Sequence, residues 1–190
     1  MLKPESKTID FLWRSFLNGD DKSFSVIYQQ HIGALLSYGH KLCPEREMVN
    51  DSIQEIFMEL FLKRKKLNIE IGNLKSYLFV ALRNNLVRKL KRGRKFSSLK
   101  TGDEHEDIIF EMEYSFQDQL IELEISQEIK EKLRTAIRAL PPRQKEIIYL
   151  RFEEELDYEA ISGIMKISVE SARKLLHRSL LSLRKVIDPS

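Results

Sequence analysis

The sequence predicts an all-α protein of two small helical domains, an N-terminal helical bundle and a C-terminal helix-turn-helix, joined by an acidic linker. Glycine and proline supply only 7 and 5 of the 190 residues, too few for the frequent turns of β-sandwiches and barrels. Apolar residues recur at spacings of three and four over most of the chain, a pattern typical of amphipathic helices. A charged stretch without this periodicity lies between the two helical parts.

The first domain, residues 1–96, begins with two predicted helices. They cover residues 9–17 and 23–42, where apolar side chains fall on one side of a helix. Asp20 or Asp21 can cap the second helix, because aspartate accepts hydrogen bonds from the free amides of a helix start.

Two further helices complete the predicted bundle. The third begins near residues 45–50, after Pro44, and the fourth begins at about Leu74 and runs into a basic tract at residues 88–95. The apolar stripe of the third is Ile53, Ile56, Phe57, Leu60 and Phe61, and that of the fourth is Leu74, Leu78, Ala81, Leu82 and Leu86. Four amphipathic helices within about 95 residues are sufficient for a helical domain.

Charge is strongly segregated around the middle of the chain. Residues 63–100 carry a net charge of +12 and residues 101–131 one of −10, although the whole chain carries only +3. Such charge separation is typical of a protein that binds a polyanionic partner or whose charged segments contact each other. Residues 97–130 are interpreted as the linker, in which residues 119–129 can form a helix.

The second domain, residues 131–190, contains two capped helices after a proline-initiated one. Pro142 suits the first turn of a helix, where its missing N–H costs no hydrogen bond. Asp157 and Ser168 can cap the next two helices. The predicted helices cover residues 143–152, 158–165 and about 169–187.

A short helix, a three-residue turn and a longer helix with a polar, basic first half form a helix-turn-helix. The longer helix is the one that enters the major groove of DNA, where Arg and Lys bind phosphates or guanine edges and Ser or His can reach either. Its candidate DNA-binding residues are Ser168, Glu170, Ser171, Arg173, Lys174, His177 and Arg178. The alternative is a helical hairpin whose charged face only contacts water.

Residues 131–187 contain five short motifs, Leu140-Pro141, Lys145-Glu146, Tyr158 to Ser162, Ile167-Ser168 and His177-Arg178-Ser179. In these motifs the segment resembles the promoter-binding C-terminal domain of bacterial sigma factors of the extracytoplasmic function (ECF) group of the sigma-70 family. The resemblance implies that the last helix binds the −35 promoter element. Lys166 stands where the family commonly has glycine in the turn, and Ser162 and Ser179 replace small alanines.

Residues 20–96 resemble the first domain of the same family. The segment Asp51-Ser52-Ile53-Gln54-Glu55-Ile56-Phe57 is similar to a helix that docks on the clamp helices of the polymerase largest subunit. Independently of the family, a second stripe of side chains lies beside the apolar stripe of this helix. Its side chains are acidic or amide at one end and apolar at the other, and this mixture suits an interface with a partner protein. Its members, the candidate core-polymerase-binding residues, are Asp51, Gln54, Glu55, Met58 and Leu62. The alternative is that Met58 and Leu62 simply widen the core stripe.

The segment 74–85 is similar to the family's helix that grips and opens the −10 promoter element. Holding unstacked bases needs hydrogen-bonding amides beside a cationic track for the backbone. The candidate −10 residues are Arg83, Asn84, Asn85, Arg88, Lys89, Lys91 and Arg92. Tyr77, which stands where many members have tryptophan, is interpreted as buried packing rather than a base platform.

Several classes of protein are excluded by the sequence. The single cysteine, Cys43, permits no internal disulfide, and the four histidines lack the spacing of metal ligands, so neither a metal nor another cofactor is expected. No motif of a catalytic site is present, so no enzyme activity is expected. No apolar run is long enough to cross a bilayer and no signal-peptide core is seen, so the expected location is the cytoplasm, without membrane insertion.

The predicted function is that of a sigma factor, which binds core RNA polymerase and directs promoter-specific initiation. The resemblance implies four partners: the clamp helices and the flap of core RNA polymerase, promoter DNA, and an anti-sigma factor. The leading alternative is a dimeric helix-turn-helix regulator of operator DNA, which would need a sensor domain in the first half. A third alternative is a helical RNA-binding protein.

Overall fold

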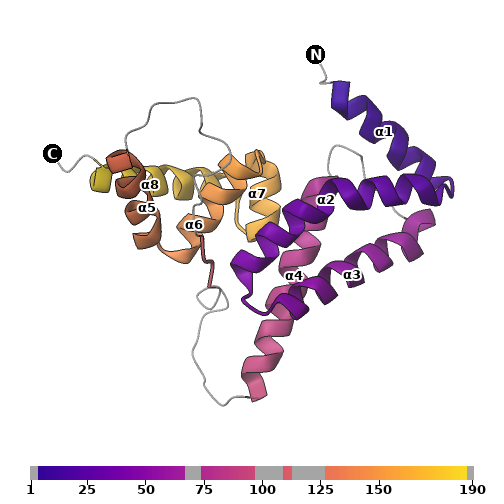
Figure 1. Cartoon of the computed structure of the whole chain (residues 1–190), viewed down its shortest axis with the longest axis horizontal. Coiled ribbons are helices and arrows are strands. Elements are labelled where there is room, and N and C mark those ends of the chain that lie inside the picture. The colour runs from indigo at the N-terminus through magenta and orange to yellow at the C-terminus, as the bar shows by residue number, and fades with distance from the viewer. Residues whose placement is uncertain (1–3, 67–73, 97–108, 113–126, 188–190) are drawn as a thin grey trace. The chain divides into compact units, whose positions relative to one another are not determined.

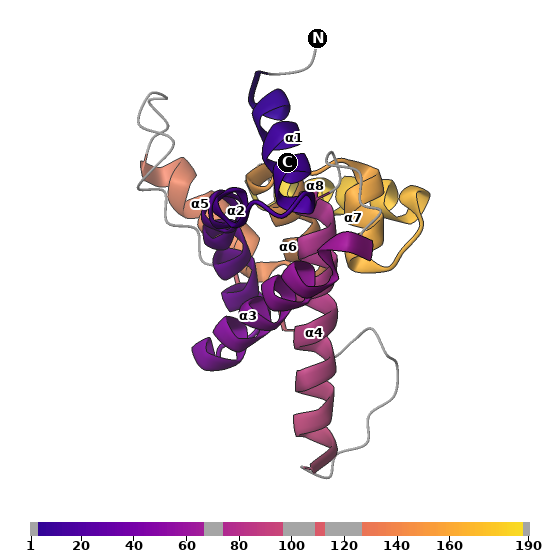
Figure 2. The same ribbon diagram turned by 90° about the vertical axis from the view of Figure 1, so that its right-hand side faces the viewer.

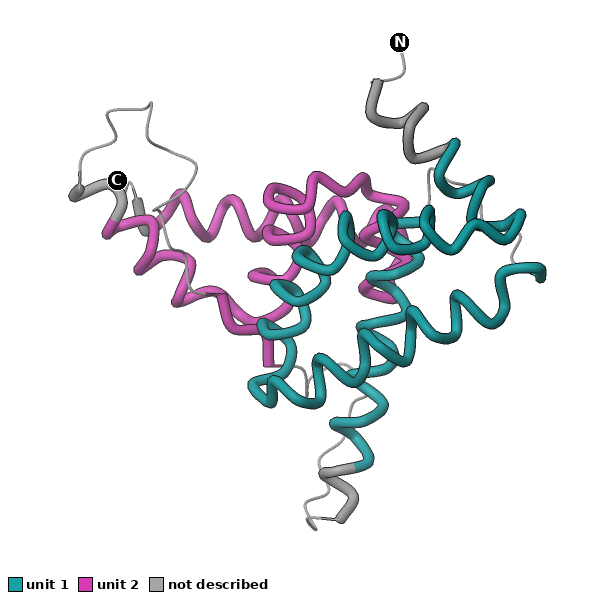
Figure 3. The backbone as a smooth tube through the Cα atoms, turned by 45° about the vertical axis from the view of Figure 1, so that its right-hand side comes forward, with its two compact units in different colours: residues 1–103 teal, residues 104–190 magenta. Residues whose placement is uncertain are grey.

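The computed structural model describes residues 4–66, 74–96, 109–112 and 127–187, which are helical apart from the short connections and contain no strand. They divide into two compact units, residues 1–103 and 104–190, coloured separately in Figure 3. The all-α fold predicted from turn scarcity and apolar periodicity is therefore confirmed.

The described residues of the first unit form four helices and one short 3₁₀ turn. They are α1 (Pro4–Leu17), α2 (Asp21–Leu42), α3 (Arg46–Lys63), η1 (Arg64–Lys66) and α4 (Leu74–Phe96). The α1 helix packs on α2, and α2, α3 and α4 pack on one another. In both views the C-terminal part of α4, which carries the basic tract, extends beyond α2 and α3 (Figures 1 and 2).

The interior of the first unit is filled by the predicted apolar stripes. Phe16 of α1 stacks on Phe24 of α2 with ring centroids 5.1 Å apart, and Phe24 meets Phe61 of α3 edge-on, also at 5.1 Å. Aromatic pairs of this kind add about 0.5–1.5 kcal/mol each to the effect of burial. Asp20 is the residue that caps α2, accepting bonds from the amides of Lys22 and Ser23 at 3.1 and 3.2 Å.

Gly39 of α2 lies tightly against Val49 of α3. A Cβ atom at Gly39 would lie 2.5 Å from Cγ1 of Val49, whose branched side chain has little rotamer freedom. We therefore expect Gly39→Ala to lower the free energy of unfolding by about 1–3 kcal/mol, measured by urea denaturation.

Gly33, on the same helix, is the matched control. A Cβ atom there meets nothing within 4 Å. Gly33→Ala should therefore raise the free energy of unfolding by about 0.5–1 kcal/mol, the ordinary helix preference for alanine. Equal effects of the two substitutions would show that helix propensity, not the close packing of Gly39, decides the outcome.

The second unit contains α5 (Gln127–Ala139), α6 (Pro142–Ile148), η3 (Tyr149–Glu153), α7 (Tyr158–Met165) and α8 (Val169–Ile187). The α8 helix packs against α5, α6 and α7, and is therefore the central helix of the unit. Pro142 occupies the first turn of α6, as predicted. Figure 3 shows the described helices of this unit in magenta.

The single helix predicted for residues 143–152 is instead an α-helix followed by the wider π turn η3. The amide of Glu154 bonds to the carbonyl of Tyr149 at 3.2 Å, one residue further back than in an α-helix. The Tyr149 hydroxyl donates to Oε1 of the buried Glu154 at 2.6 Å. The wider turn thus lets a carboxylate from the acidic loop be satisfied inside the unit.

The predicted caps and turn of the helix-turn-helix are confirmed. Asp157 accepts a bond from the amide of Ala160 at 2.8 Å, and Ser168 Oγ accepts one from the amide of Ser171 at 3.1 Å. Between them Lys166 adopts left-handed backbone angles of φ 53° and ψ 51° and ends α7. This is the conformation that favours glycine, so the chain tolerates a lysine there at some cost.

The predicted acidic linker is only partly within the described residues. Residues 97–108 and 113–126 lie outside them, and residues 127–130 belong to α5. The segment that lies between the two gaps, 109–112, is described and contains two buried side chains, Phe110 and Met112. The predicted helix over residues 119–129 is therefore described only from Gln127 on, where it is part of α5.

Candidate nucleic-acid and partner interfaces

The α3 helix has one buried and one exposed apolar stripe. Ile53, Ile56, Phe57 and Leu60 are buried, whereas 64% of Met58 and 75% of Leu62 is exposed. The two side chains therefore do not widen the core stripe. Asp51, Gln54 and Glu55 are also exposed, so α3 presents all five candidate core-polymerase-binding residues on its outer side.

The candidate −10 residues of α4 fall on two different sides of the helix. Asn84, Arg88 and Arg92 are exposed and Lys91 is half-buried, whereas Arg83 and Asn85 are only 4% and 9% exposed. Helical spacing explains the division, since Leu78, Leu82 and Leu86 recur every four residues on the buried side and Asn85 follows Leu82 by three. Tyr77, which lies one turn before Ala81, is half-buried.

Glu55 links α3 to α4. The Asn85 amide nitrogen donates to Oε2 of Glu55 at 2.8 Å, and the Lys89 ammonium donates to Oε1 at 3.0 Å. The hydrogen bond from Asn85, followed by that from Lys89, lowers the pKa of the Glu55 carboxyl below its ordinary value. A candidate polymerase-binding residue therefore holds two candidate −10 residues.

Acidification should remove this link between the helices. Because the folded-state pKa of Glu55 is lowered, its contribution to stability is present above the unfolded value, near 4.5, and is lost as pH falls through the folded value. We expect Glu55→Gln to lower the free energy of unfolding at pH 7 by less than about 1 kcal/mol, the usual size for a partly exposed pair. The difference in free energy of unfolding between Glu55→Gln and the parent should vanish when the urea titrations are repeated at progressively lower pH.

Glu59→Gln is the matched control, because the ion pair of Glu59 with Lys63 lies within α3. It should leave the exchange protection of the α4 amides unchanged, whereas Glu55→Gln should lower it. A Glu55→Gln deficit that stays constant with pH would contradict a role for the carboxylate charge.

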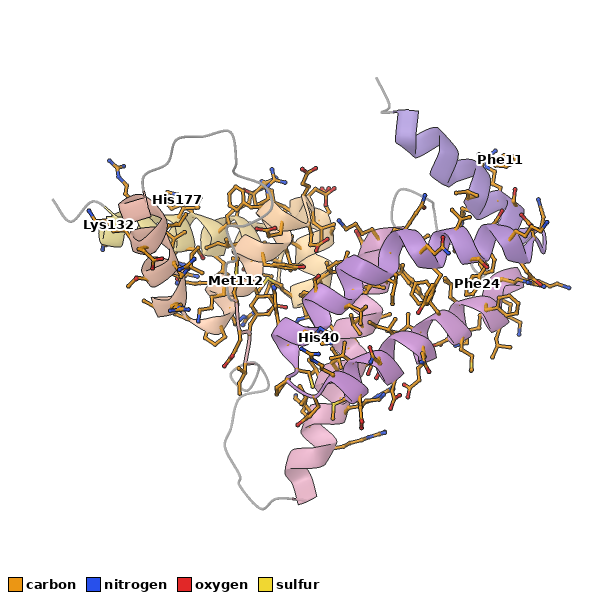
Figure 4. All side chains as sticks on the ribbon, viewed as in Figure 1. Phe11, Phe24, His40, Met112, Lys132 and His177 are labelled. Carbon is orange, nitrogen blue, oxygen red and sulfur yellow. The ribbon has the colours of Figure 1, made fainter. Side chains whose placement is uncertain are left out.

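The first half of α8 presents every candidate −35 residue to the outside. Ser168, Glu170, Ser171, Arg173, Lys174, His177 and Arg178 are all exposed. Ala172, Leu176 and Ser179 point the other way and are buried, and the Ser179 hydroxyl donates to the carbonyl of Leu175 at 2.8 Å. Figure 4 labels His177 on this helix. The polar and apolar sides predicted from the spacing are therefore separated in the folded unit.

Some of these side chains are held in place by neighbours. The guanidinium of Arg173 lies over the ring of Tyr158, 5.4 Å from its centroid, and that of Arg151 lies over the same ring at 5.5 Å. Lys174 is paired with Glu170 at 2.6 Å. Cation–π contact restrains Arg173 and leaves the N–H groups at the edge of its planar fork available for a phosphate or a base.

Arg151 and Tyr158 were not among the residues expected to matter for this surface. Tyr158 lies at the first position of α7, directly after the Asp157 cap, and Arg151 donates to the carbonyl of Leu156 at 2.9 Å. The sequence does show an aromatic residue, Tyr158, beside the helix-turn-helix and a basic residue, Arg151, inside an apolar run. The contact between these two side chains depends on the tertiary fold, so the sequence alone did not predict it.

No described group of histidine, cysteine, aspartate and glutamate side chains could hold a metal ion. The thiol of Cys43 is buried, and burial raises its pKa, so the protonated form is favoured. Burial lowers the pKa of His31, whose Nε2 atom is buried without a hydrogen-bond partner. No helix among the described residues combines the length and apolarity needed to span a membrane.

Comparison with known protein families matches two parts of the chain. Residues 27–96 match the family described as Sigma-70 region 2, and residues 130–183 match Sigma-70, region 4. A curated relative, the ECF RNA polymerase sigma factor SigM of Bacillus subtilis (strain 168), is 24% identical over 158 residues, which cover 83% of this chain and 91% of the relative.

Solved structures that share the fold include two complexes. The sigma factor RpoE in complex with the anti-sigma factor NepR, from Bartonella quintana, aligns with a TM-score of 0.59 and 21% identity over 87% of this chain and 97% of that one. CnrH in complex with the cytosolic domain of CnrY aligns with a TM-score of 0.56 and 15% identity over 96% of this chain and 99% of that one.

Proposed function

This chain belongs to the ECF group of the sigma-70 family, the sigma factors that direct RNA polymerase to promoters, and from this membership we propose how its surfaces divide the work. Residues 1–96 act as sigma region 2, which binds core polymerase and the −10 element. Residues 131–190 act as region 4, which binds the −35 element. The family is not one of enzymes, and we propose that the chain has no catalytic residue of its own.

The core-polymerase interface that we propose is the exposed side of α3. Its support is the exposure of Met58 and Leu62, which are 64% and 75% accessible on a helix that already buries a complete apolar stripe. Apolar side chains left outside a core, flanked by the polar Asp51 and Gln54, are typical of a site that a protein partner covers. We propose the clamp helices of the polymerase largest subunit as that partner.

The −10 interface that we propose is the exposed side of α4. Asn84 supplies amide hydrogen bonds to unstacked bases, and Arg88 and Arg92 follow it at helical spacing along the backbone track. Lys91 extends the track. Asn85 and Lys89 support this surface from the side of α3, where Glu55 holds both, and Arg83 is buried in the unit.

The −35 interface that we propose is the first half of α8, placed in the major groove. Arg173 and Arg178 contact base edges or phosphates, and Ser171 and His177 provide further donors. Ser168 caps the helix and Glu170 pairs with Lys174, so these three orient the surface as well as lining it. Two modest contacts on one chain give an avidity that neither domain has alone.

We further propose that region 4 contacts the polymerase flap, that the protein works in the cytoplasm, and that an anti-sigma factor controls it. The support for the last point is that both structural neighbours are complexes, RpoE with the anti-sigma factor NepR and CnrH with the cytosolic domain of CnrY. A dimeric operator-binding regulator is not favoured, because the first unit matches sigma region 2 rather than a sensor domain.

Runoff transcription with core polymerase and a pool of genomic promoters tests the proposal. The full chain should produce transcripts that share a motif upstream of their start sites, and core polymerase alone should not. The triple variant with alanine at Arg173, His177 and Arg178 serves as the control, because it should lose promoter selection and retain binding to core polymerase. Transcripts that start without any shared motif would refute the assignment.

A further inference from the structure

A short part of the acidic stretch is built into the second unit. Phe110 and Met112 are only 1% and 4% exposed, whereas Ile109 is 53% exposed and Glu111 is exposed as well. Buried and exposed side chains thus alternate along residues 109–112, as they do when an extended segment lies on an apolar surface. Figure 4 labels Met112 on this segment.

Phe110 has an identified partner within the second unit. Its ring centroid lies 5.8 Å from that of Tyr149, with the rings inclined by 57°. Tyr149 is itself fixed, because it is buried in η3 and its hydroxyl donates to the buried Glu154 at 2.6 Å. The phenyl ring therefore packs on a rigid aromatic platform rather than on a movable side chain.

This attachment divides the sequence between the two units into two unequal parts. Phe110 lies 14 residues after Phe96, the last residue of α4. Gln127, the first residue of α5, lies 31 residues after Phe96. Whatever its conformation, the chain spans at most about 3.6 Å per residue, so Phe110 can lie at most about 50 Å from Phe96. Without the attachment the corresponding limit at Gln127 is about 110 Å.

We propose that Phe110 is an anchor that shortens the tether between the two DNA-binding units and so determines which spacing of the −10 and −35 elements the protein accepts. The proposal rests on the proposed function and adds a specificity-determining residue to it. Each base pair adds about 3.4 Å along the DNA axis, so a tether limit near 50 Å constrains spacing far more than one near 110 Å. Effective concentration falls with roughly the −3/2 power of tether length, which gives about a threefold loss on release.

The first test uses the free protein and needs no promoter. In a chain with Cys43 replaced by serine, dyes are placed on Gln30→Cys of α2 and Glu159→Cys of α7, two exposed positions in different units. Single-molecule energy transfer should report a broader and longer distribution of dye separations for Phe110→Ala than for the parent. Ile109→Ala, the exposed neighbour, should leave the distribution unchanged.

Two measurements separate release of the anchor from unfolding. Far-UV circular dichroism should show that Phe110→Ala retains the helical content of the parent chain. Phe110→Leu, which keeps an apolar side chain but no ring, should give an intermediate distribution of dye separations. A Phe110→Ala variant that is folded and has the parental distribution would overturn the anchor.

The second test is transcription from promoters whose spacer is lengthened or shortened one base pair at a time. The unmodified chain should show a sharp optimum. At the optimal spacer, Phe110→Ala should give about threefold less transcript than the parent. Its transcription should fall less steeply than that of the parent when the spacer is changed by two base pairs. Ile109→Ala should keep the parental profile. An unchanged sharp optimum in Phe110→Ala would overturn the role in spacing. Absence of transcription with the unmodified chain would instead refute the proposed function, and the dye measurement would still decide the anchor.

Discussion

Truncating Met58 and Leu62 together to alanine should weaken binding of the chain to core polymerase by about 10- to 100-fold, the range seen when central apolar contacts of an interface are removed. Both side chains lie largely outside the core, at 64% and 75% exposure, so the free energy of unfolding should stay within about 0.5 kcal/mol of the parent. Fluorescence anisotropy of a labelled chain titrated with core polymerase measures the first effect, and urea denaturation the second.

Two controls make this result specific to the outer side of α3. Phe11→Ala removes an apolar side chain of α1 that is 70% exposed and should not change polymerase binding; Figure 4 shows Phe11 on that helix. Leu60→Ala, from the buried stripe of α3, should instead cost about 2–5 kcal/mol of stability. Polymerase affinity that survives the double substitution would place the interface elsewhere on the chain.

The helices themselves could be predicted because their signals are local. Apolar spacing predicted α2, α3 and α4, and the caps at Asp20, Asp157 and Ser168 lie within three residues of the amides that they bind. The π turn η3 could not be predicted. It depends on the buried bond between Tyr149 and Glu154, and a glutamate in an acidic loop gives no sign that it will be buried.

The candidate surfaces were predictable to the extent that helical spacing separates their sides. Spacing placed Met58 and Leu62 beside the core stripe, but it could not decide between core and surface, because that depends on how α2 and α4 pack on α3. On α4, Asn84 and Asn85 look alike as residue types, yet only Asn85 continues the line of Leu78 and Leu82 into the buried side.

The attachment at Phe110 was hidden by its surroundings. Residues 101–131 carry a net charge of −10, and a segment of such high average charge is expected to stay in solvent. The decisive feature is a single phenyl ring and the position of Tyr149, 39 residues away in the sequence, which no local pattern contains.

Arg173→Ala should weaken −35-dependent promoter binding by about tenfold or more, equivalent to the 1–3 kcal/mol that a well-oriented base contact contributes. Arg173 is exposed in the first half of α8 and is held over the Tyr158 ring, so its guanidinium loses little freedom when it binds. Binding of the complete holoenzyme to promoters that carry or lack the −35 element should show the loss only when the element is present.

Arg184→Ala provides the matched control, because it removes the same charge from an exposed position in the last turn of the same helix. It should weaken binding slightly, and equally with and without the −35 element, since a distant charge acts only through the screened field. Arg173→Lys separates charge from shape: lysine keeps the charge but lacks the planar fork, so most of the loss should remain. Equal losses for Arg173→Ala and Arg184→Ala would mean that α8 contributes general attraction to DNA rather than recognition of the element.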